Sequence, residues 1–302
     1  MNDDLISVIM STYNESEQEL ESSVSSILNQ SHRNIEFIIV NDNPENTLLE
    51  QYLSKITDSR VIILKNEVNL GLVKSLNKAL QYAKGNYIAR MDADDIAWHN
   101  RLETQLSYLK DNNLDIVGSD IQLIDEDNKI IKDRVHFPSS EKISRMFIKY
   151  GNCMAHPTWL VKKRVYVDLN GYREVESCED YDFIVRLMYS TEYHLGNTSE
   201  IGLQYRIRSS GVSKSSEAQQ YVLRSFIAKN KKRINTLSMN DINLYIESED
   251  FKKNVSAYKQ YKKDKDEAKK YKNLTCWLKM LSNKFFYIIQ LEKYSLKIRS
   301  ML

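Results

Sequence analysis

Polar and acidic side chains follow directly after three apolar runs in the first third of the chain. Asp92 and Asp94, one residue apart, come after the run YIARM. Two carboxylates with this spacing can both reach one hard divalent cation, which prefers oxygen ligands and shares such sites with phosphates. The alternative is a polar turn in which an aspartate caps a helix at 101–109. The residues that follow the other two runs are Thr12, Tyr13, Glu15 and Asp42.

Two further features near these runs each have a structural and a functional interpretation. Asp42 either accepts hydrogen bonds from a nucleobase or caps the helix that follows Pro44. The segment Asn69-Leu70-Gly71 precedes an expected helix, and Gly71 leaves room for a ligand near the N-terminus of that helix. An ordinary loop-to-helix turn explains the same residues.

A second acidic pair, Glu179 and Asp180, opens a segment with helical spacing. The helix dipole stabilises acidic residues in a first turn, so the pair is either structural or contains a general base aimed into a cleft. His156 is either a hydrogen-bonded core histidine or part of an acceptor pocket. The five histidines show no HxxxH-type spacing, and GxxxxGK[ST], GxGxxG and GxSxG do not occur. These absences count against histidine-zinc, P-loop, dinucleotide and α/β-hydrolase chemistry.

The elements that must position these residues alternate between strand and helix. Strand, helix, strand, helix favours right-handed crossovers and a mainly parallel sheet. Ligands in such sheets bind beyond the carboxyl ends of the strands, where the polar residues above lie. Apolar runs predict strands at 5–10, 35–40, 61–64 and 87–91, and 3.6-residue spacing predicts helices at 20–28 and 72–83.

Composition divides the chain into two parts. All 8 glycines and 3 prolines of the 302 residues lie at or before Gly211. Residues 229–302 carry 18 Lys and Arg against 8 Asp and Glu, a net charge of +10, whereas residues 1–228 carry a net charge of −8. A long basic stretch without helix breakers is typical of helices. We therefore predict an α/β domain at 1–215 and a basic, helical C-terminal region at 216–302.

The cellular location follows from what the sequence lacks. The first residues, MNDDLISVIM, predict no signal peptide. No apolar stretch approaches the roughly 20 residues of a spanning helix. Three scattered cysteines favour a reducing compartment. We expect a cytoplasmic protein, at most peripheral on the inner face of the plasma membrane.

In combination, the sequence resembles family 2 glycosyltransferases, particularly bacterial enzymes of capsular and exopolysaccharide synthesis. The resemblance covers about the first 215 residues and rests on seven segments in the family's order. It implies the GT-A fold, an α/β fold with a mainly parallel mixed sheet flanked by helices, followed here by a helical appendage. The segments are SVIMSTYNE at 7–15, IIVND at 38–42, NLGLVKSLNKAL at 69–80, GNYIARMDADD at 85–95, HPTWLVKKRVY at 156–166, NGYRE at 170–174 and CEDYDFIVRL at 178–187.

The resemblance implies an inverting glycosyltransferase. It would move a hexose or N-acetylhexosamine from a nucleoside-diphosphate sugar, UDP-linked, to a lipid-linked glycan acceptor in cell-surface polysaccharide synthesis. Asp92 and Asp94 would hold Mn²⁺ or Mg²⁺ against the diphosphate, and Asp180 would be the catalytic base. The residues implied on the nucleotide-sugar side are Thr12, Tyr13, Glu15, Asp42, Asn69, Gly71, Lys74, Asn77, Asp92 and Ala93. On the acceptor side we expect Glu179, His156 and Trp159.

One position departs from the family's pattern. Relatives often read YRxHxxxxS after the last strand, where the histidine can be a third metal ligand, but residues 205–213 here read YRIRSSGVS, with Arg208 in that place. Arginine stays protonated and cannot ligate a metal, yet it offers a fixed cation with a fork of donors. We therefore expect weaker metal binding with Arg208 at the diphosphate, or a loss of activity.

The basic tail interleaves lysines with aromatic residues such as Trp277 and Phe286. It either lies on an anionic membrane surface or packs as helices on the first domain or on another subunit, as in an oligomer. No nucleic-acid module is recognisable, so we expect no nucleic-acid partner. Two rival functions stay open: a non-catalytic nucleotide-binding or assembly protein on the same fold, and a nucleotidyltransferase. The lack of a glycine-rich basic loop after the first strand counts against the latter.

Overall fold

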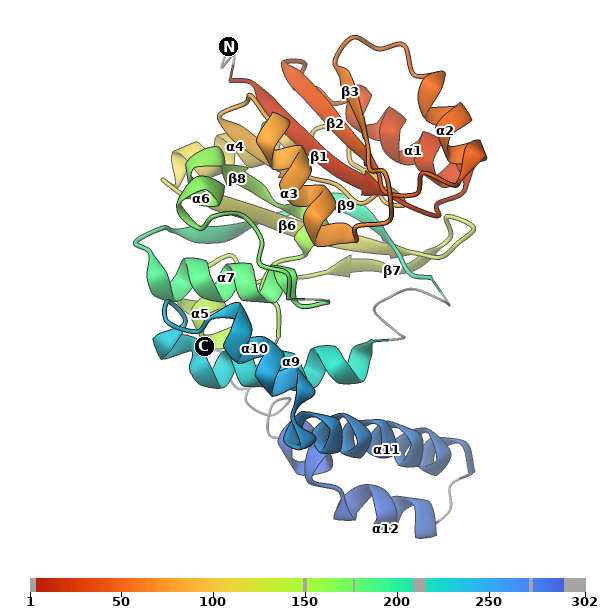
Figure 1. Cartoon of the computed structure of the whole chain (residues 1–302), viewed down its shortest axis with the longest axis vertical. Helices are drawn as coiled ribbons and strands as arrows, with labels where there is room; N and C mark the ends of the chain where they lie inside the picture. The colour runs from red at the N-terminus through yellow and green to blue at the C-terminus, as the bar shows by residue number, and fades with distance from the viewer. Residues whose placement is uncertain (1–3, 149–150, 176, 209–215, 272–273, 291–302) are drawn as a thin grey trace.

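A computed structural model describes residues 4–148, 151–175, 177–208, 216–271 and 274–290 of the chain. Within these ranges, the strands form a single nine-stranded sheet (Figure 1). The strands are β1 (Ile6–Thr12), β2 (Ile35–Asn41), β3 (Val61–Lys65), β4 (Tyr87–Arg90), β5 (Ile96–Ala97), β6 (Ile116–Ile124), β7 (Ile130–Val135), β8 (Leu160–Lys162) and β9 (Leu195–Arg206). Their order across the sheet is β3-β2-β1-β4-β8-β6-β9-β5, and β7 pairs with β6.

The first four strands are parallel, as predicted. β1 pairs with β2 on one side and with β4 on the other, and β2 pairs with β3. β1 and β2 consist mainly of apolar residues that are buried on both faces, which is typical of the centre of a parallel sheet. The second half is mixed: β8 runs antiparallel to both β4 and β6, whereas β9 runs parallel to β6.

Helices cover both faces of this sheet. Leu20, Leu49 and Leu102, from three different helices, pack in one core cluster with Val8 of β1. Leu76 and Phe183 pack with Ile9 in a second cluster on the opposite face. The helices of the first face are α1 (Glu17–Leu28), α2 (Thr47–Ser54) and α4 (Arg101–Asp111), and those of the second are α3 (Leu72–Tyr82), α6 (Lys163–Asp168) and α7 (Glu179–Ser190).

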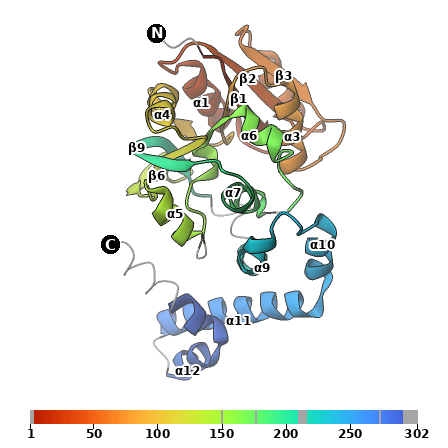
Figure 2. The same ribbon diagram turned by 90° about the vertical axis from the view of Figure 1, so that its left-hand side faces the viewer.

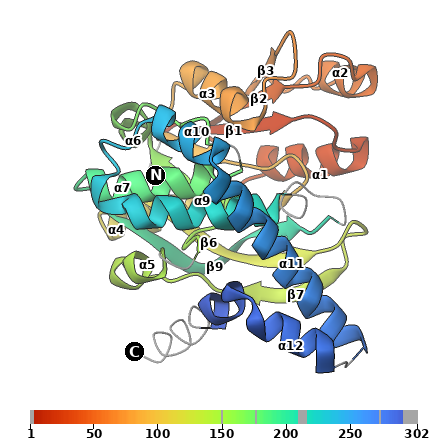
Figure 3. The same ribbon diagram turned by 60° about the horizontal axis from the view of Figure 1, so that its bottom comes forward.

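The C-terminal region consists mainly of helices over its described residues, as predicted. Its helices are α9 (Glu217–Asn230), α10 (Met239–Glu247), α11 (Glu249–Tyr271) and α12 (Leu274–Ser282). α9 packs beside α7, and the second core cluster continues into it through Val222 and Ile227 (Figure 3). α11 and α12 pack on each other at the end of the molecule away from the sheet (Figures 1 and 2).

The boundary predicted at residue 215 falls in 209–215, outside the described residues, so the division into two domains stays a prediction. The end of the tail, 291–302, also lies outside them. None of the helices within the described ranges is long and apolar enough to cross a membrane.

Candidate active site

The carboxyl ends of β1, β2 and β4 meet at one edge of the sheet. Thr12 is paired with Asn41 in the parallel register, and the backbone N–H of Asp42 donates to the carbonyl of Thr12 over 2.9 Å. On the other side of β1, the N–H of Met91 donates to Ile9, so Asp92 follows at the same edge. The structure thus gathers the three predicted groups of polar residues in one place.

The turn after β1 is organised by Glu15. Its Oε2 accepts hydrogen bonds from the Thr12 hydroxyl at 2.6 Å and from the backbone N–H of Tyr13 at 2.8 Å. The Tyr13 ring is left 41% exposed. This geometry presents an aromatic face beside the strand ends, where a nucleobase can stack.

Asp42 anchors the segment that leads into α3. Its carboxylate accepts from the side-chain amide of Asn66 at 2.7 Å and from the backbone N–H groups of Leu70 and Gly71 at 2.8 Å each. The alternative in which Asp42 caps the helix after Pro44 is wrong. Asp42 instead fixes the loop between β3 and α3.

The actual cap of α2 is Asn46, whose side chain accepts from the backbone N–H of Leu49. At the start of α3, Gly71 has a φ of +83°, which an L side chain rarely adopts, and a Cβ there would meet nothing within 4 Å. Asn69 accepts from the N–H of Gly71 within the same turn. The N-terminus of α3 is therefore open, as expected of a ligand-facing turn.

Lys74 and Asn77 tie α3 to the segment before α7. The amide of Asn77 donates to the carbonyl of Tyr172 at 2.8 Å and accepts from the N–H of Tyr172 at 2.9 Å. Lys74 forms an exposed ion pair with Glu174 at 3.5 Å. Both side chains already have protein partners, and their contact with a donor stays a prediction.

Arginines hold both carboxylates of the Asp92–Asp94 pair. Asp92 forms an ion pair with Arg90, and Oδ2 of Asp94 lies 2.8 Å from Nε of Arg208. Ala93 between them is buried. The alternative in which an aspartate caps α4 is wrong, because Asn100 is the N-cap residue and the side chain that accepts from the first turn, at the N–H of Leu102, is that of Gln30.

Arg206 supports the backbone of the same turn and was not singled out from the sequence. Its Nε donates to the carbonyl of Asp94 and its backbone N–H donates to Oδ1 of Asp95, each over 2.8 Å. Ser23 of α1 donates to the carbonyl of Asp92. The position of Arg206 in the run YRIR, two residues before Arg208, is the sequence signal that could have identified it.

The charges of this turn fit a divalent cation. Burial, followed by the charge of Asp92, raises the pKa of Asp94 to about 6, and the same two causes raise the pKa of Asp95 well above its ordinary value. Across the described ranges, no three His, Cys, Asp or Glu side chains are placed to hold a metal together. A site with one or two carboxylates, completed by substrate phosphates, is the usual arrangement for Mg²⁺. The donor set therefore fits an ion that arrives with a diphosphate.

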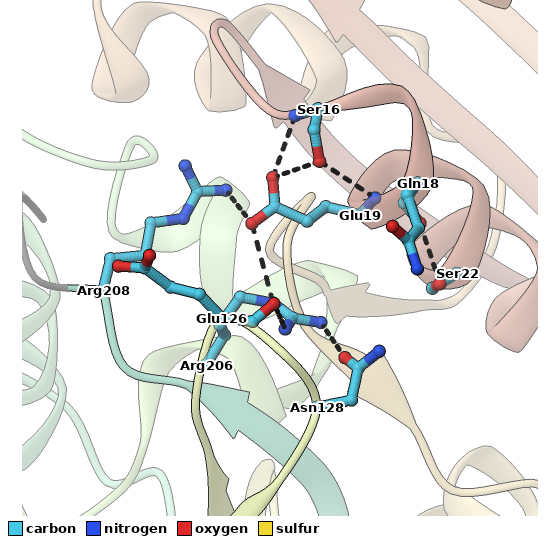
Figure 4. Close-up of a pocket in the computed structure, with 8 residues that line it drawn as sticks. All are labelled: Ser16, Gln18, Glu19, Ser22, Glu126, Asn128, Arg206 and Arg208. Carbon is cyan, nitrogen blue, oxygen red and sulfur yellow. Dashed lines mark hydrogen bonds and ion pairs between the residues drawn. The ribbon is translucent and has the colours of Figure 1, made fainter.

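A pocket of about 310 Å³ lies beside this turn, between the start of α1, the loop after β6 and the end of β9 (Figure 4). Figure 4 shows Arg206 and Arg208 both directed towards Glu19 of α1. Nη2 of Arg208 is 3.2 Å and Nε of Arg206 is 3.8 Å from Oε1 of Glu19. Arg208 thus lines the pocket and contacts Asp94 at the same time.

The second acidic pair lies at the start of α7, as predicted. Asp180 accepts hydrogen bonds from the side chain of Asn152 and from the N–H of Tyr181. Burial, followed by the charge of Asp180, raises the pKa of Glu179 to about 8, and burial also raises the pKa of Asp180. With a pKa of about 8, Glu179 is mostly protonated at neutral pH. Asp180, whose pKa is also raised, is a stronger proton acceptor when ionised than an ordinary aspartate.

Asp182, in the same helical turn, has a different role. It is fully buried and forms ion pairs with Arg173 and Arg186. In the described part of the chain, neither Glu179 nor Asp180 has such an ion pair. The two arginines therefore balance the charge of Asp182, whereas no described ion pair balances a charge on Glu179 or Asp180.

His156 and Trp159 are core residues. Nε2 of His156 lies 2.9 Å from the hydroxyl of Tyr172, and burial lowers the pKa of His156 far below its ordinary value, so the ring is neutral. Trp159 is fully buried and stacks on Tyr172. The geometry matches the core-histidine alternative, and an acceptor-side role for either residue stays a prediction.

Solved structures share this fold. S. aureus TarS residues 1–349, in complex with UDP-GlcNAc, matches with a TM-score of 0.58 at 18% identity, over 80% of this chain and 72% of that one. The mannosyltransferase PcManGT from Pyrobaculum calidifontis, in complex with GDP-Man and Mn²⁺, matches with a TM-score of 0.58 at 13% identity, over 98% and 84%. The predicted GT-A fold is confirmed.

Sequence comparison defines the family. The family model described as "Glycosyl transferase family 2" matches residues 7–168 of this chain. Glycosyltransferase MJ1057 of Methanocaldococcus jannaschii is 38% identical over 211 residues, 68% of this chain and 72% of that protein. The O-antigen biosynthesis glycosyltransferase WbnJ of Escherichia coli is 36% identical over 233 residues, 75% and 90%. The chain belongs to glycosyl transferase family 2, and the resemblance stated above is confirmed.

A third relative is named for a specific reaction. The UDP-Glc:alpha-D-GlcNAc-diphosphoundecaprenol beta-1,3-glucosyltransferase WfgD of Escherichia coli is 30% identical over 214 residues, which are 70% of this chain and 81% of that protein.

Proposed function

We propose that this glycosyltransferase transfers a hexose or N-acetylhexosamine from a UDP-linked donor to a glycan acceptor, with inversion at the anomeric carbon. One observation carries the proposal: the ends of the parallel strands β1, β2 and β4 bring Tyr13, Asp42 and Asp92 to one edge of the sheet. Ligands of such sheets bind beyond the carboxyl ends of the strands. The name of WfgD, which includes UDP-Glc, and the complex of TarS with UDP-GlcNAc support a UDP-linked donor.

The residues divide the chemistry between them. Tyr13 stacks with the base, and the segment anchored by Asp42 lines the nucleotide. Asp92 and Asp94 would hold a divalent ion, Mn²⁺ or Mg²⁺, which would neutralise charge on the leaving diphosphate. The Mn²⁺ named in the PcManGT complex supports such an ion.

Arg208 supplies a second, fixed cation beside Asp94, which can hydrogen-bond a diphosphate oxygen directly. On the opposite side, Asp180 takes the proton of the acceptor hydroxyl as that oxygen attacks the anomeric carbon. The attack breaks the bond to the diphosphate in the same step. A single displacement inverts the configuration and requires no covalent intermediate.

The acceptor in this proposal is a lipid-linked glycan of a cell-surface polysaccharide. The names of WbnJ and WfgD, with O-antigen biosynthesis and a diphosphoundecaprenol acceptor, support it. The enzyme would work in the cytoplasm, at the inner face of the plasma membrane. α12 exposes Trp277 and Leu278 next to Lys279, the pattern of a helix that lies on an anionic surface.

The test is nucleoside diphosphate release from a panel of UDP-, GDP- and dTDP-sugars with Mn²⁺, Mg²⁺ or EDTA. We expect release from a UDP-sugar, by slow hydrolysis where no acceptor is present, and loss of release in Asp94→Ala and Asp180→Asn. Asp111→Asn, at the exposed end of α4, is the matched carboxylate control. Absence of both release and UDP binding would contradict the proposal.

The ion pairs of Asp92 and Asp94 with arginine favour one rival, a non-catalytic nucleotide-binding protein on this fold. UDP binding without turnover in the presence of a lipid-linked acceptor would support that rival. Pyrophosphate release from a nucleoside triphosphate and a sugar phosphate would instead indicate a nucleotidyltransferase.

A further inference from the structure

Glu19 of α1 uses its two carboxylate oxygens for different partners. Oε2 accepts from the backbone N–H of Ser16 at 2.9 Å and from the Ser16 hydroxyl at 2.7 Å, and that hydroxyl accepts from the N–H of Glu19. This capping box fixes the Glu19 carboxylate at the first turn of the helix. Oε1 faces Arg208 at 3.2 Å and Arg206 at 3.8 Å (Figure 4).

Arg206 is a fixed cation next to Glu19. Its side chain is 1% exposed. The guanidinium donates at 2.7–3.3 Å to four acceptors, which are the carbonyls of Asp94, Asp125 and Glu126 and Oδ1 of Asn128. These bonds hold Arg206 to the turn after β4 and to the loop after β6.

Arg208 is held by fewer partners. Its Nε pairs with Asp94 at 2.8 Å and its Nη2 pairs with Glu19, and its side chain is 25% exposed. Figure 4 shows the third nitrogen of this guanidinium without a bond to any of the residues drawn. A divalent ion that binds Asp94 would take away one of the two ion pairs. Glu19 is then the remaining partner of Arg208 in the described part of the chain.

The Glu19 carboxylate also separates two like charges. Oε1 lies within 4 Å of both guanidinium groups, and without this negative charge Arg206 and Arg208 would repel each other. Because Arg206 has four hydrogen-bond acceptors, Arg208 is the side chain that would move. The bonds from Ser16 to Glu19 and from Glu19 to Arg208 therefore connect the start of α1 to the cation beside Asp94.

We propose that Glu19 is a positioning residue that holds the guanidinium of Arg208 where the donor diphosphate binds. The inference deepens the proposed function and rests on it for the identity of the donor. It goes beyond helix capping because the cap uses Oε2, whereas Arg208 is held by Oε1.

Two substitutions of Glu19 separate its charge from its reach. Glu19→Gln removes the charge but keeps the capping box, because glutamine also serves at this position. Glu19→Asp keeps the charge and shortens the side chain. An aspartate forms the same capping box in α10, where Asp241 pairs with Ser238. The shorter carboxylate of Glu19→Asp would therefore be retained at Ser16, out of reach of Arg208.

Glu17→Gln is the matched control. Glu17 is an acidic residue of the same first turn, and its charge interacts equally with the helix dipole. Its side chain is 66% exposed, and its described ion pair is with Lys55 at 3.6 Å. It has no described contact with either arginine of the pocket.

The measurement is UDP affinity by calorimetry in the presence of EDTA, so that Arg208 faces the diphosphate without a metal ion. We expect the affinity to fall about fivefold to tenfold in Glu19→Gln and in Glu19→Asp, and to stay at the wild-type value in Glu17→Gln. Wild-type affinity in Glu19→Asp, or higher affinity in Glu19→Gln, would overturn the proposal, because either would show that Glu19 acts by its charge alone.

A double-mutant cycle tests whether Glu19 acts through Arg208. Arg208→Ala should weaken UDP binding, and Glu19→Gln added to Arg208→Ala should weaken it no further. An equal loss from Glu19→Gln with and without Arg208 would overturn the proposal. If Glu19→Gln does not fold, Glu19→Asp takes its place in the cycle.

Two further outcomes separate this inference from the proposed function. UDP binding with Mn²⁺ but not with EDTA in the wild type would overturn the inference alone, because Arg208 would then not hold the diphosphate. If UDP binds in neither condition, the proposed function fails by itself. Hydrogen exchange of the Arg208 Nε–H, followed by ¹⁵N NMR, then decides whether Glu19 holds Arg208. Faster exchange in Glu19→Gln than in Glu17→Gln supports this contact, and equal exchange overturns it.

Discussion

Nε of Arg208 lies 2.8 Å from Oδ2 of Asp94, and the same guanidinium lies 3.2 Å from Glu19 of α1. A divalent ion and a guanidinium that share one carboxylate compete for its oxygens. Because arginine remains protonated in proteins, this competition persists at every physiological pH. The proposed donor site therefore contains a cation of its own, the guanidinium of Arg208, before any metal binds.

Arg208→His should strengthen metal binding. The substitution removes the competing charge from Asp94 and supplies a neutral imidazole, which is a metal ligand where guanidinium is not. We expect the affinity for Mn²⁺ in the presence of UDP to rise by about tenfold, measured by electron paramagnetic resonance of free Mn²⁺.

Arg208→Ala is the control for that experiment, because it removes the charge without adding a ligand. It should bind Mn²⁺ more tightly than the wild type and less tightly than Arg208→His. Equal affinity in the wild type and both variants would show that Arg208 does not compete with the ion.

Asn77→Ala should reduce stability more than nucleotide affinity. Both polar groups of the Asn77 amide are used by the backbone of Tyr172, and their loss leaves that backbone unpaired. We expect the free energy of unfolding to fall by about 1–3 kcal/mol in urea titrations. Lys74→Ala, which removes only an exposed ion pair, should change it by less than about 0.5 kcal/mol. A large loss of UDP affinity in Asn77→Ala would instead support the donor contact implied by the family resemblance.

The first half of the sheet was predictable because each of its strands is a continuous apolar run followed by polar residues. β5 and β8 were not, because they are two and three residues long and are defined by their partners β9, β4 and β6 rather than by their own pattern. A strand of that length carries no periodicity to detect.

The features of the candidate site also divide into those that were predictable from the sequence and those that were not. The positions of Asp92, Asp94 and Asp180 were predictable from local pattern and resemblance. Their partners were not, since Asp42 bonds to Gly71, 29 residues away, and Arg206 bonds to the Asp94 carbonyl, 112 residues away. Such contacts depend on tertiary packing, which local spacing does not encode.

Glu179 should make the fold less stable as the pH rises. Its pKa is about 8 in the folded protein against 4.5 for the free group, because burial and Asp180 disfavour the charge. Between these values the folded state binds more protons than the unfolded state, so the free energy of unfolding falls with rising pH. The decrease should be on the order of a few kcal/mol between about pH 4.5 and 8, and Glu179→Gln should abolish it.

Urea titrations of both proteins at several pH values across that window measure the effect. Glu141 provides a control of opposite sign: burial would raise its pKa, but hydrogen bonds from His194 and Arg145 lower it. Glu141→Gln should therefore remove stability that the wild type gains as the pH rises through the acid range. An identical pH dependence in the wild type and Glu179→Gln would contradict the burial argument.

Trp277 should enter the headgroup layer of anionic vesicles. It is 42% exposed on α12, with Leu278 57% exposed beside it, and residues 229–302 carry a net charge of +10. An aromatic ring near the headgroups and lysines above them would together attract the region to anionic lipid. We expect binding to phosphatidylglycerol-containing vesicles with a blue shift of tryptophan emission. Salt should weaken this binding because the attraction is electrostatic.

Trp277→Ser should lose the shift, and Trp98→Phe, which removes another exposed tryptophan, should keep it. Equal binding to neutral and anionic vesicles would contradict the electrostatic attraction. A shift that persists in Trp277→Ser would show that Trp277 does not enter the headgroup layer.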